Sequence, residues 1–268
     1  MSDSNNTSSE AGEEERHPHD VAVDTHEQPF LEHIIELRSR ILRSLAAVFV
    51  LFVPFFIYGD ELYTWIAEPL VSRLPEGSTM IATEVASPFF TPLKLAIFAA
   101  IFVGVPFWLH QVWSFVSPGL YRHEKKFAVP LLTSSIILFY MGMAFVYYLV
   151  FPLVFAFFTQ AGPEDMTMMT DINLYLNFVL KMFFAFGLAF EVPIATMLLV
   201  WSGITTADKM ANKRPYIIVG CFVVGMILTP PDVISQLLLA IPTWILFEVG
   251  VFFARFIEKR EVESNPST

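Results

Sequence analysis

The feature that most constrains this chain is a series of long apolar runs, separated by short polar breaks, that begins at Ile41. The hydrocarbon core of a bilayer is about 30 Å thick, and a helix needs about 20 apolar residues to cross it. Hydrophobic residues make up 55% of the 268 residues and charged residues only 16%. A water-soluble globule of this size would expose much of that apolar surface. The sequence therefore predicts an all-α, polytopic membrane protein and argues against a soluble enzyme, a nucleic-acid-binding protein or a disordered chain.

Six runs qualify as candidate transmembrane helices, and prolines within them predict their shapes. The runs are 41–58, 95–115, 127–158, 172–201, 216–229 and 233–256. The third and fourth exceed one span, so they are expected to tilt, to emerge from the bilayer, or to kink at Pro130, Pro152 or Pro193. The fifth has only 14 residues, about 21 Å as a helix, and Pro242 is expected to break the sixth. We therefore expect short fifth and sixth helices that thin the bilayer around them.

The distribution of lysine and arginine predicts the orientation of the spans. Thirteen of the 16 basic residues lie in the N-terminal segment up to Arg43, after the second and fourth spans, and at the C-terminal end from Arg255 onward. The opposite side holds only Arg73 and Lys94. By the positive-inside rule both termini are cytoplasmic, which agrees with an even number of spans. The long loop 59–94 between the first two spans is rich in proline, which favours short helices and turns there.

The two ends of the chain differ in composition from its apolar middle. Residues 1–28 are polar and low in complexity and are expected to be a disordered, acidic cytoplasmic tail. The first 37 residues hold ten acids and one base, which accounts for most of the net charge of −10. No signal peptide is expected, because the first apolar run begins late and follows acidic residues. We expect a membrane domain at 29–257 and a short cytoplasmic tail at 258–268.

Three ionisable residues, Lys181, Glu191 and Glu248, fall within the candidate spans, where a charge costs about 2.5–3.5 kcal/mol on insertion scales. Glu191 precedes Pro193, whose ring frees a backbone carbonyl, so a kinked polar pocket for a substrate or partner helix is the favoured interpretation. A hydrogen bond to a neighbouring helix is the simpler alternative. For Glu248 the two interpretations weigh equally, and Lys181 is expected to extend toward the membrane surface.

Two further groups of polar residues lie near the ends of the spans. Glu36 and Glu124 both fall on the predicted cytoplasmic side, where paired carboxylates would bind guanidinium groups bidentately. A helix entry at the membrane surface and a solvated loop with local ion pairs explain them as well, and spacing does not show that the two converge. The turn between the last two spans contains Thr229, Asp232 and Gln236, which either cap the sixth helix or dock a partner helix.

Signatures of catalysis and of cofactor binding are missing from the sequence. It contains no phosphate-binding loop, no zinc-binding HExxH and no nucleophile elbow. The single cysteine, Cys221, excludes an internal disulfide and a cysteine metal cluster. The sequence therefore predicts no enzyme, no metal and no cofactor, and any transport must draw on a gradient or on binding.

Seven segments in order carry a specific family pattern. They are HIIELRSRI (33–41), GSTMIATEVASPFFTPLK (77–94), QVWSFVSPGLYRHEKK (111–126), FYMGMAFVYYLVFPL (139–153), FGLAFEVPIA (186–195), KRPYIIVGCFVVGMILTPPDVISQ (213–236) and AIPTWILFEVGVFFAR (240–255). Over about 85% of its length the chain resembles the TatC family, the core membrane subunit of the bacterial twin-arginine protein translocase. The acidic tail and Lys181 depart from the family pattern.

The resemblance implies a concave, cup-like bundle of six helices in the cytoplasmic (inner) membrane. It also implies a receptor that binds twin-arginine signal peptides and exports folded proteins with the proton-motive force, together with TatA, TatB and further copies of itself. The positions implied in signal-peptide binding, or in the shape of that site, are Glu36, Arg38, Pro69, Pro106, Phe115, Leu120 and Glu124. Glu191 matches a buried acid of the concave face. Met226, Thr229 and Gln236 match a cluster where the single-span partners dock, with Asp232 in the turn beside it.

Two other classes of protein remain as alternatives. A secondary transporter that uses Glu191 and Glu248 as proton or cation sites predicts an internal repeat, which the sequence lacks. It also predicts uptake of a small solute by this chain alone. A purely structural membrane scaffold predicts that Glu36→Ala and Glu124→Ala retain function.

Overall fold

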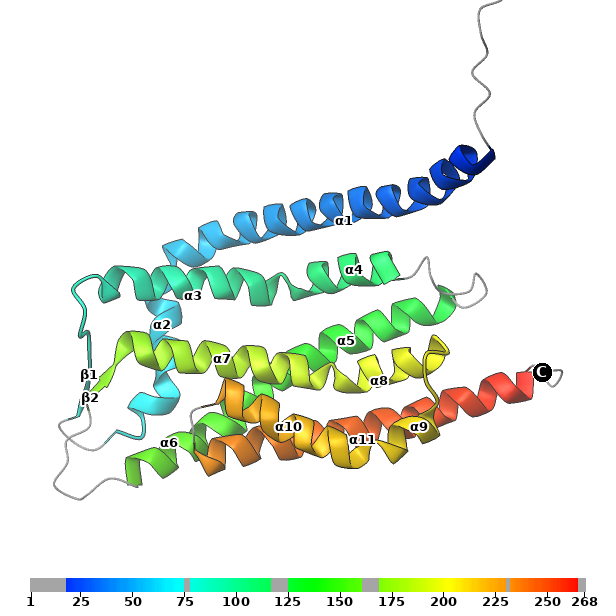
Figure 1. Ribbon diagram of the computed structural model, residues 1–268. Helices are drawn as coiled ribbons and strands as arrows, with labels where there is room; N and C mark the ends of the chain where they lie inside the picture. The colour runs from blue at the N-terminus through cyan, green and yellow to red at the C-terminus, as the bar shows by residue number, and fades with distance from the viewer. Residues whose placement is uncertain (1–17, 75–77, 117–124, 161–168, 230–231, 265–268) are drawn as a thin grey trace, which may run out of the picture. The chain divides into compact units, whose positions relative to one another are not determined.

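The computed structural model describes residues 18–74, 78–116, 125–160, 169–229 and 232–264 (Figure 1). The chain divides into two units, residues 1–43 and 44–268, which are described separately. The first unit contains the beginning of α1 (Pro18–Ile57). Residues 18–28, which we expected in the disordered tail, are therefore helical. Pro18 opens the helix, where a missing amide hydrogen breaks no intrahelical bond.

The apolar runs form helices of the lengths that a bilayer requires. Among the described residues, four continuous stretches are long and apolar enough to cross a membrane: Ile35–Ile57, Val129–Gln160, Ile172–Trp201 and Val233–Phe256. A further span is α3 (Ser87–Val103) followed by α4 (Val105–Val116), bent by 48° at Gly104. The fifth run forms the shorter apolar helix α10 (Arg214–Leu228). The predicted series of apolar helices is thus confirmed.

Two of the long spans change geometry partway along. α5 (Lys125–Phe145) continues through a π turn, η2 (Val146–Val150), into α6 (Phe151–Gln160). Pro152 lies two residues after the end of that turn, and its ring and missing donor disfavour regular α geometry over the preceding residues. α7 (Ile172–Phe190) ends at Glu191, and α8 (Val192–Trp201) begins with Pro193 in its first turn. The helix is thus interrupted at Glu191, two residues before Pro193, and a kink at Pro193 stays a prediction.

The last hairpin has one short and one long arm. After α9 (Ala207–Asn212), α10 has 15 residues, about 22 Å, which confirms the short fifth helix. The prediction of a short, broken sixth helix is wrong, because α11 (Val233–Ser264) has 32 residues and continues through Pro242. The Thr243 hydroxyl donates to the Leu239 carbonyl at 2.7 Å beside the proline. α11 packs along α8 and α10.

Residues 59–94, hereafter the 59–94 cap, fold into short elements as expected. The cap contains α2 (Gly59–Val71), the strand β1 (Thr79–Ile81) and the beginning of α3. β1 pairs in parallel with β2 (Met169–Asp171), just before α7 (Figure 1). This small sheet lies outside the all-α expectation, because three-residue strands leave no periodic signal in a sequence.

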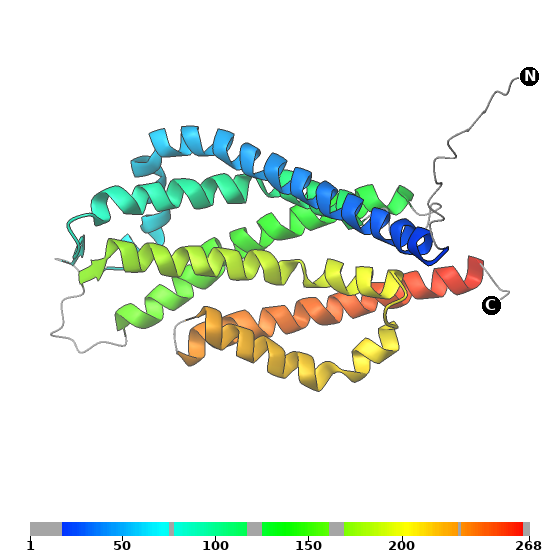
Figure 2. The same cartoon turned by 45° about the horizontal axis from the view of Figure 1, so that its top comes forward.

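The core of the second unit lies between α3, α5 to α6 and α7, which run close together in both views (Figure 2). Two glycines let α5 and α7 approach closely. A Cβ atom on Gly187 would lie 2.6 Å from the Phe139 ring, and one on Gly142 would lie 2.6 Å from the Phe186 carbonyl oxygen. Small residues at such contacts are typical of membrane helices, which associate by close packing rather than by exclusion of water.

Candidate functional site

Asp171 fastens the 59–94 cap to the start of α7. Its Oδ1 accepts hydrogen bonds from the backbone N–H groups of Asn173 and Leu174, both at 2.9 Å, as an N-cap does. Its Oδ2 accepts from the Thr83 hydroxyl at 2.6 Å and from the Thr83 N–H at 2.9 Å. These bonds, with the Thr83 hydroxyl contributing most, lower the pKa of Asp171 to about 2.

The rest of the attachment uses a lysine and two tyrosines. The Lys94 ammonium donates to the side-chain oxygens of Asn173 and Asn177, both at 2.8 Å. The Tyr175 hydroxyl donates to the Ile66 carbonyl at 2.7 Å, and the Tyr63 hydroxyl donates to the Ile172 carbonyl at 3.3 Å. Burial raises the pKa of Tyr63. From the sequence, Lys94 is predicted only to be a basic residue of the loop between the first two spans. The i, i+4 spacing of the two asparagines is the available signal for a shared partner.

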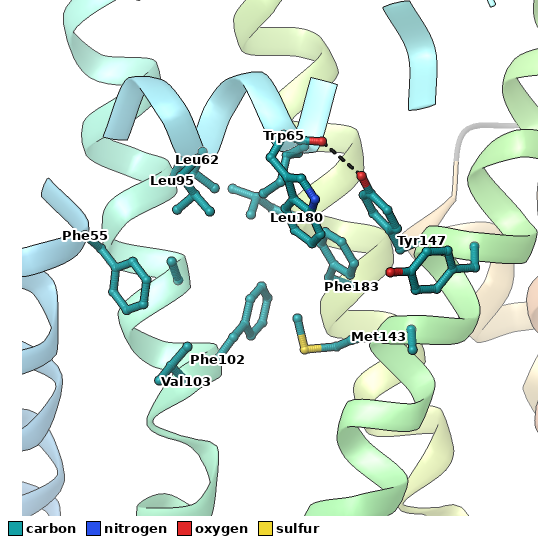
Figure 3. A pocket seen from close by; sticks show the side chains of 14 residues that line it. Phe55, Leu62, Trp65, Leu95, Phe102, Val103, Met143, Tyr147, Leu180 and Phe183 are labelled. Carbon is teal, nitrogen blue, oxygen red and sulfur yellow. Dashed lines mark hydrogen bonds between the residues drawn. The ribbon is translucent and has the colours of Figure 1, made fainter. Parts of the chain in front are cut away.

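An apolar cavity of about 290 Å³ lies against α2, between α3, the α5–η2 segment and α7 (Figure 3). Trp65 and Tyr147 stack at its edge with ring centroids 4.6 Å apart, and the Tyr147 hydroxyl donates to the Trp65 carbonyl at 3.0 Å. Phe102 and Phe183 form part of its wall. The described lining residues are uncharged and mostly aliphatic or aromatic, so the cavity suits an apolar group.

Glu191 lies at the break between α7 and α8 and is half-buried. One carboxylate oxygen accepts a hydrogen bond from the Ser135 hydroxyl of α5. The other, Oε1, is buried and has no partner among the described residues. The simple interpretation, a bond to a neighbouring helix, is therefore present. The unpartnered oxygen could still accept a hydrogen bond from a polar group of a substrate or partner helix, as the pocket interpretation requires.

The turn between α10 and α11 uses most of its polar groups internally. The Thr229 hydroxyl donates to the Gly225 carbonyl at 2.9 Å, and the Gln236 amide donates to the Phe222 carbonyl at 3.0 Å. Asp232 Oδ1 accepts from the Ser235 N–H at 2.6 Å, which confirms that Asp232 caps α11. Met226 is 60% exposed. The outward-facing part of this cluster is therefore apolar, while Thr229 and Gln236 hold the hairpin closed.

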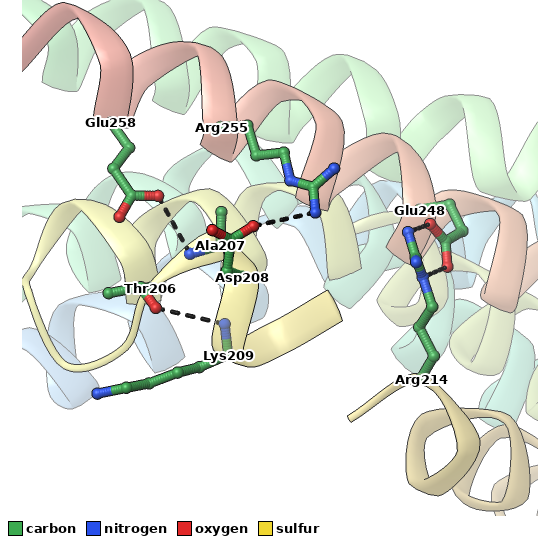
Figure 4. A network of polar contacts seen from close by, with 8 residues as sticks. All are labelled: Thr206, Ala207, Asp208, Lys209, Arg214, Glu248, Arg255 and Glu258. Atoms are coloured by element: carbon green, nitrogen blue, oxygen red, sulfur yellow. Dashed lines mark hydrogen bonds and ion pairs between the residues drawn. The ribbon is translucent and has the colours of Figure 1, made fainter. Parts of the chain in front are cut away.

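Glu248 has a partner that the sequence does not reveal. The Arg214 guanidinium donates to both of its carboxylate oxygens, from Nε at 2.6 Å and from Nη2 at 2.7 Å (Figure 4). The sequence marks Arg214 only as a topology-setting base, and the 34 residues between the two conceal the pair. Lys181 is exposed on α7, and its extension toward the membrane surface stays a prediction.

In the first unit, Glu36 is a partly exposed residue of α1. It forms an i, i+4 ion pair with Arg40, whose Nε lies 3.0 Å from Glu36 Oε1. Arg38, two residues after Glu36, is exposed. Glu124 and Leu120 lie outside the described residues, so the convergence of Glu36 and Glu124 stays a prediction.

The remaining predicted positions lie at helix turns of the second unit. Pro69 is inside α2, Pro106 is in the first turn of α4, and Phe115 is near the end of α4. Pro69 and Pro106 are both partly buried. Both prolines fix local backbone geometry in short helices, which agrees with a role in shaping a site.

The structure has several apolar helices long enough to cross a membrane, and polar groups lie where two of these helices are interrupted. These features define a multi-pass helical membrane protein. Residues 32–242 match the family model for the Sec-independent protein translocase protein TatC. The chain therefore belongs to the TatC family and is a component of a Sec-independent protein translocase.

Individual relatives agree along nearly the whole length. The TatC protein of Azotobacter chroococcum mcd 1 is 57% identical over 235 residues, which cover 88% of this chain and 92% of the relative. That of Escherichia coli K12 is 54% identical over 229 residues, covering 85% and 89%. A crystal structure described as the twin-arginine translocase receptor TatC matches with a TM-score of 0.74 at 35% identity, covering 84% of this chain and 98% of that chain.

Proposed function

We propose that this protein is the receptor for twin-arginine signal peptides and the core subunit of a translocase driven by the proton-motive force. In this proposal it lies in the inner membrane with both termini in the cytoplasm. It exports folded proteins together with TatA, TatB and further copies of itself. The observation that carries the proposal is Glu36, a partly exposed carboxylate on α1 that already binds a guanidinium, that of Arg40.

The chemistry of recognition follows from the shape of arginine. A guanidinium presents a planar fork of donors that matches a carboxylate, whereas lysine offers a point charge, so a Lys-Lys signal should bind poorly. One partly exposed ion pair contributes about 1 kcal/mol or less. Two arginines bound by Glu36 and Glu124 together would contribute more, and Arg40 would exchange its partner as the signal binds.

The apolar part of a signal peptide needs an apolar surface next to the arginine site. We assign this role to the bundle of membrane helices. The residues assigned to the shape of the site are Pro69, Pro106, Phe115 and Leu120. Arg38 is assigned to the signal-peptide site beside Glu36. Glu191 provides a polar group on the concave face.

Docking of TatA and TatB is assigned to the face of α10 that carries Met226. Among the described residues of α10, Gly225 alone is buried, so most of the helix surface is available to a partner. Thr229, Gln236 and Asp232 keep this helix in place. Because α10 is about 22 Å long against a bilayer core of about 30 Å, the membrane beside it is expected to be thin. A bilayer of bulk thickness around the purified protein would contradict this last step.

The decisive experiment is site-specific crosslinking of a twin-arginine signal peptide to membranes that contain this chain. We expect crosslinks at Leu120 and its neighbours. They should disappear with Glu36→Ala, with Glu124→Ala and with a Lys-Lys signal. Glu61→Ala, which removes an exposed carboxylate from α2, is the matched control and should leave the crosslinks unchanged. Crosslinks that are indifferent to all of these changes would overturn the receptor assignment.

The structure bears on the competing classes of function. Glu248, one of the two acids that a transporter would use, is engaged in a bidentate pair with Arg214, which disfavours it as a proton site. The transporter still predicts solute uptake by vesicles that contain this chain alone. The scaffold predicts normal export by Glu36→Ala and Glu124→Ala at normal protein levels.

A further inference from the structure

A pocket of about 480 Å³ lies where α10 begins beside the second half of α11, away from the sites assigned above. It has two kinds of wall. Arg214, Glu248 and Arg255 form the polar wall, and Val249, Phe252 and Phe253 form the apolar wall. All three apolar side chains are at least 40% exposed. A charged wall beside an exposed apolar wall matches the boundary between lipid headgroups and acyl chains.

The two guanidinium groups retain hydrogen-bonding capacity toward this pocket. Arg214 uses Nε and Nη2 for Glu248, and Arg255 uses Nη2 for Asp208 at 3.1 Å. An arginine has five N–H donors, so each group keeps donors beyond these bonds. The Arg255–Asp208 pair is weak and exchangeable, because the Arg255 and Asp208 side chains are 48% and 85% exposed.

The surrounding charges favour an anion. Glu248 and Arg255 leave α11 on the same side, facing α9 and the start of α10 (Figure 4). Lys213 directly precedes Arg214 and adds positive charge at the start of α10, whereas the Lys209 side chain points away from Arg214 (Figure 4). Basic pockets between transmembrane helices on the cytoplasmic side are a recurring means of binding anionic phospholipids.

We propose that this pocket binds one anionic phospholipid. Its phosphodiester accepts hydrogen bonds from Arg214 and Arg255, and an acyl chain lies along Val249, Phe252 and Phe253. Glu248 is a positioning residue, since it fixes the Arg214 guanidinium while leaving its other edge available. Only the choice of leaflet, the inner one, rests on the proposed topology.

The test is native mass spectrometry of the full-length, delipidated protein in detergent, titrated with dioleoylphosphatidylglycerol. Dioleoylphosphatidylcholine and inorganic phosphate are the comparison ligands. We expect the first equivalent of phosphatidylglycerol to bind at least about fivefold more tightly than phosphatidylcholine, and millimolar inorganic phosphate not to displace it. Equal binding of the two lipids would overturn the proposal. Displacement by phosphate would also overturn it, because the site would then bind the free anion.

Substitutions in the pocket distinguish lipid bound at this site from lipid bound elsewhere on the protein. Arg255→Gln, and the double variant Arg214→Gln with Glu248→Gln, should each weaken phosphatidylglycerol binding by about fivefold. Arg255→Lys should keep part of the binding, and Arg73→Gln, an exposed base on the 59–94 cap, should change nothing. Unchanged binding in both glutamine variants would contradict the proposal. The assay contains no signal peptide, so its outcome is independent of the crosslinking experiment.

Discussion

At the scale of single residues, polar side chains satisfy the backbone where membrane helices bend. The bend at Gly104 interrupts the helix ladder near the Phe102 and Val103 carbonyls. The Tyr140 hydroxyl of α5 lies 3.1 Å from the first carbonyl oxygen and 3.2 Å from the second. Because lipid supplies no hydrogen-bond donors, a carbonyl left unpaired in a membrane is costly. Tyr140 therefore stabilises the bent α3–α4 span.

This arrangement makes Tyr140→Phe informative. Loss of the hydroxyl should lower the free energy of unfolding by about 1–2 kcal/mol, since it removes the donor to two helix carbonyls at the bend. Thermal or denaturant unfolding in detergent measures the change. Tyr148→Phe is the matched control, because Tyr148 is exposed and no hydrogen bond of its hydroxyl is found among the described residues. Equal effects of the two variants would contradict the role of Tyr140.

The carboxylate of Asp171 predicts a dependence of stability on pH. Its pKa is about 2 in the folded protein and 3.8 ordinarily, so the ionised group stabilises the fold fully above pH 3.8. That contribution is lost as the pH falls through 3.8 toward 2. Asp171→Asn should therefore melt at a lower temperature than wild type at pH 7, and the difference should shrink as the pH falls toward 2. Glu61→Gln should show neither effect.

Partners such as these could not be predicted from the sequence. Tyr140 is 38 residues from Phe102 and Thr83 is 88 from Asp171, and no local pattern marks either contact. A functional candidate is easier to predict when its residue type is unusual for its surroundings. Glu191 is such a residue, since it is a carboxylate two residues before Pro193 inside an apolar run. The sequence does not reveal that Ser135 is its partner. The partner of Glu248 was hidden for the same reason, because it lies on another helix.

At the scale of helices, the contact between α8 and α11 depends on a glycine. A Cβ atom on Gly250 would lie 2.8 Å from Pro193 Cα and 2.9 Å from Thr196 Cβ, so Gly250→Ala forces the helices apart. We expect a loss of about 1–3 kcal/mol in unfolding free energy. Gly220 of α10 is the matched control, since nothing lies within 4 Å of the point that an added methyl group would occupy. Gly220→Ala should be neutral or stabilising by up to about 1 kcal/mol, from helix propensity. The opposite order would refute this packing.

The helices themselves were largely predictable, because span length and apolar composition are set by the bilayer. Proline was a less certain guide. Pro193 lies just after the helix break at Glu191, whereas Pro242 lies inside the continuous helix α11. A proline in an apolar run therefore does not determine by itself whether a membrane helix breaks.

At the scale of the whole molecule, the charge distribution predicts which loops face which side. In a Cys221→Ala background, a membrane-impermeant maleimide should label Val85→Cys, on the 59–94 cap, from the outside of intact inner membranes. Ile204→Cys, in the loop after α8, should be labelled only after permeabilisation. Both positions are strongly exposed, so access to the side chain does not bias the comparison. The reverse pattern would contradict the proposed orientation.

The attachment of the 59–94 cap to residues 171–177 has a consequence for how the protein is made. Ribosomes add about 5–20 residues per second, so Asp171 emerges about 4–18 s after Thr83. During that interval β1 has no partner strand, and Lys94 has neither asparagine. On the proposed orientation the cap is the first loop to cross the membrane, and it stays incomplete until residues 171–177 have been made. A nascent chain stalled before that point should be digested within the cap by protease added on that side, while the finished protein resists.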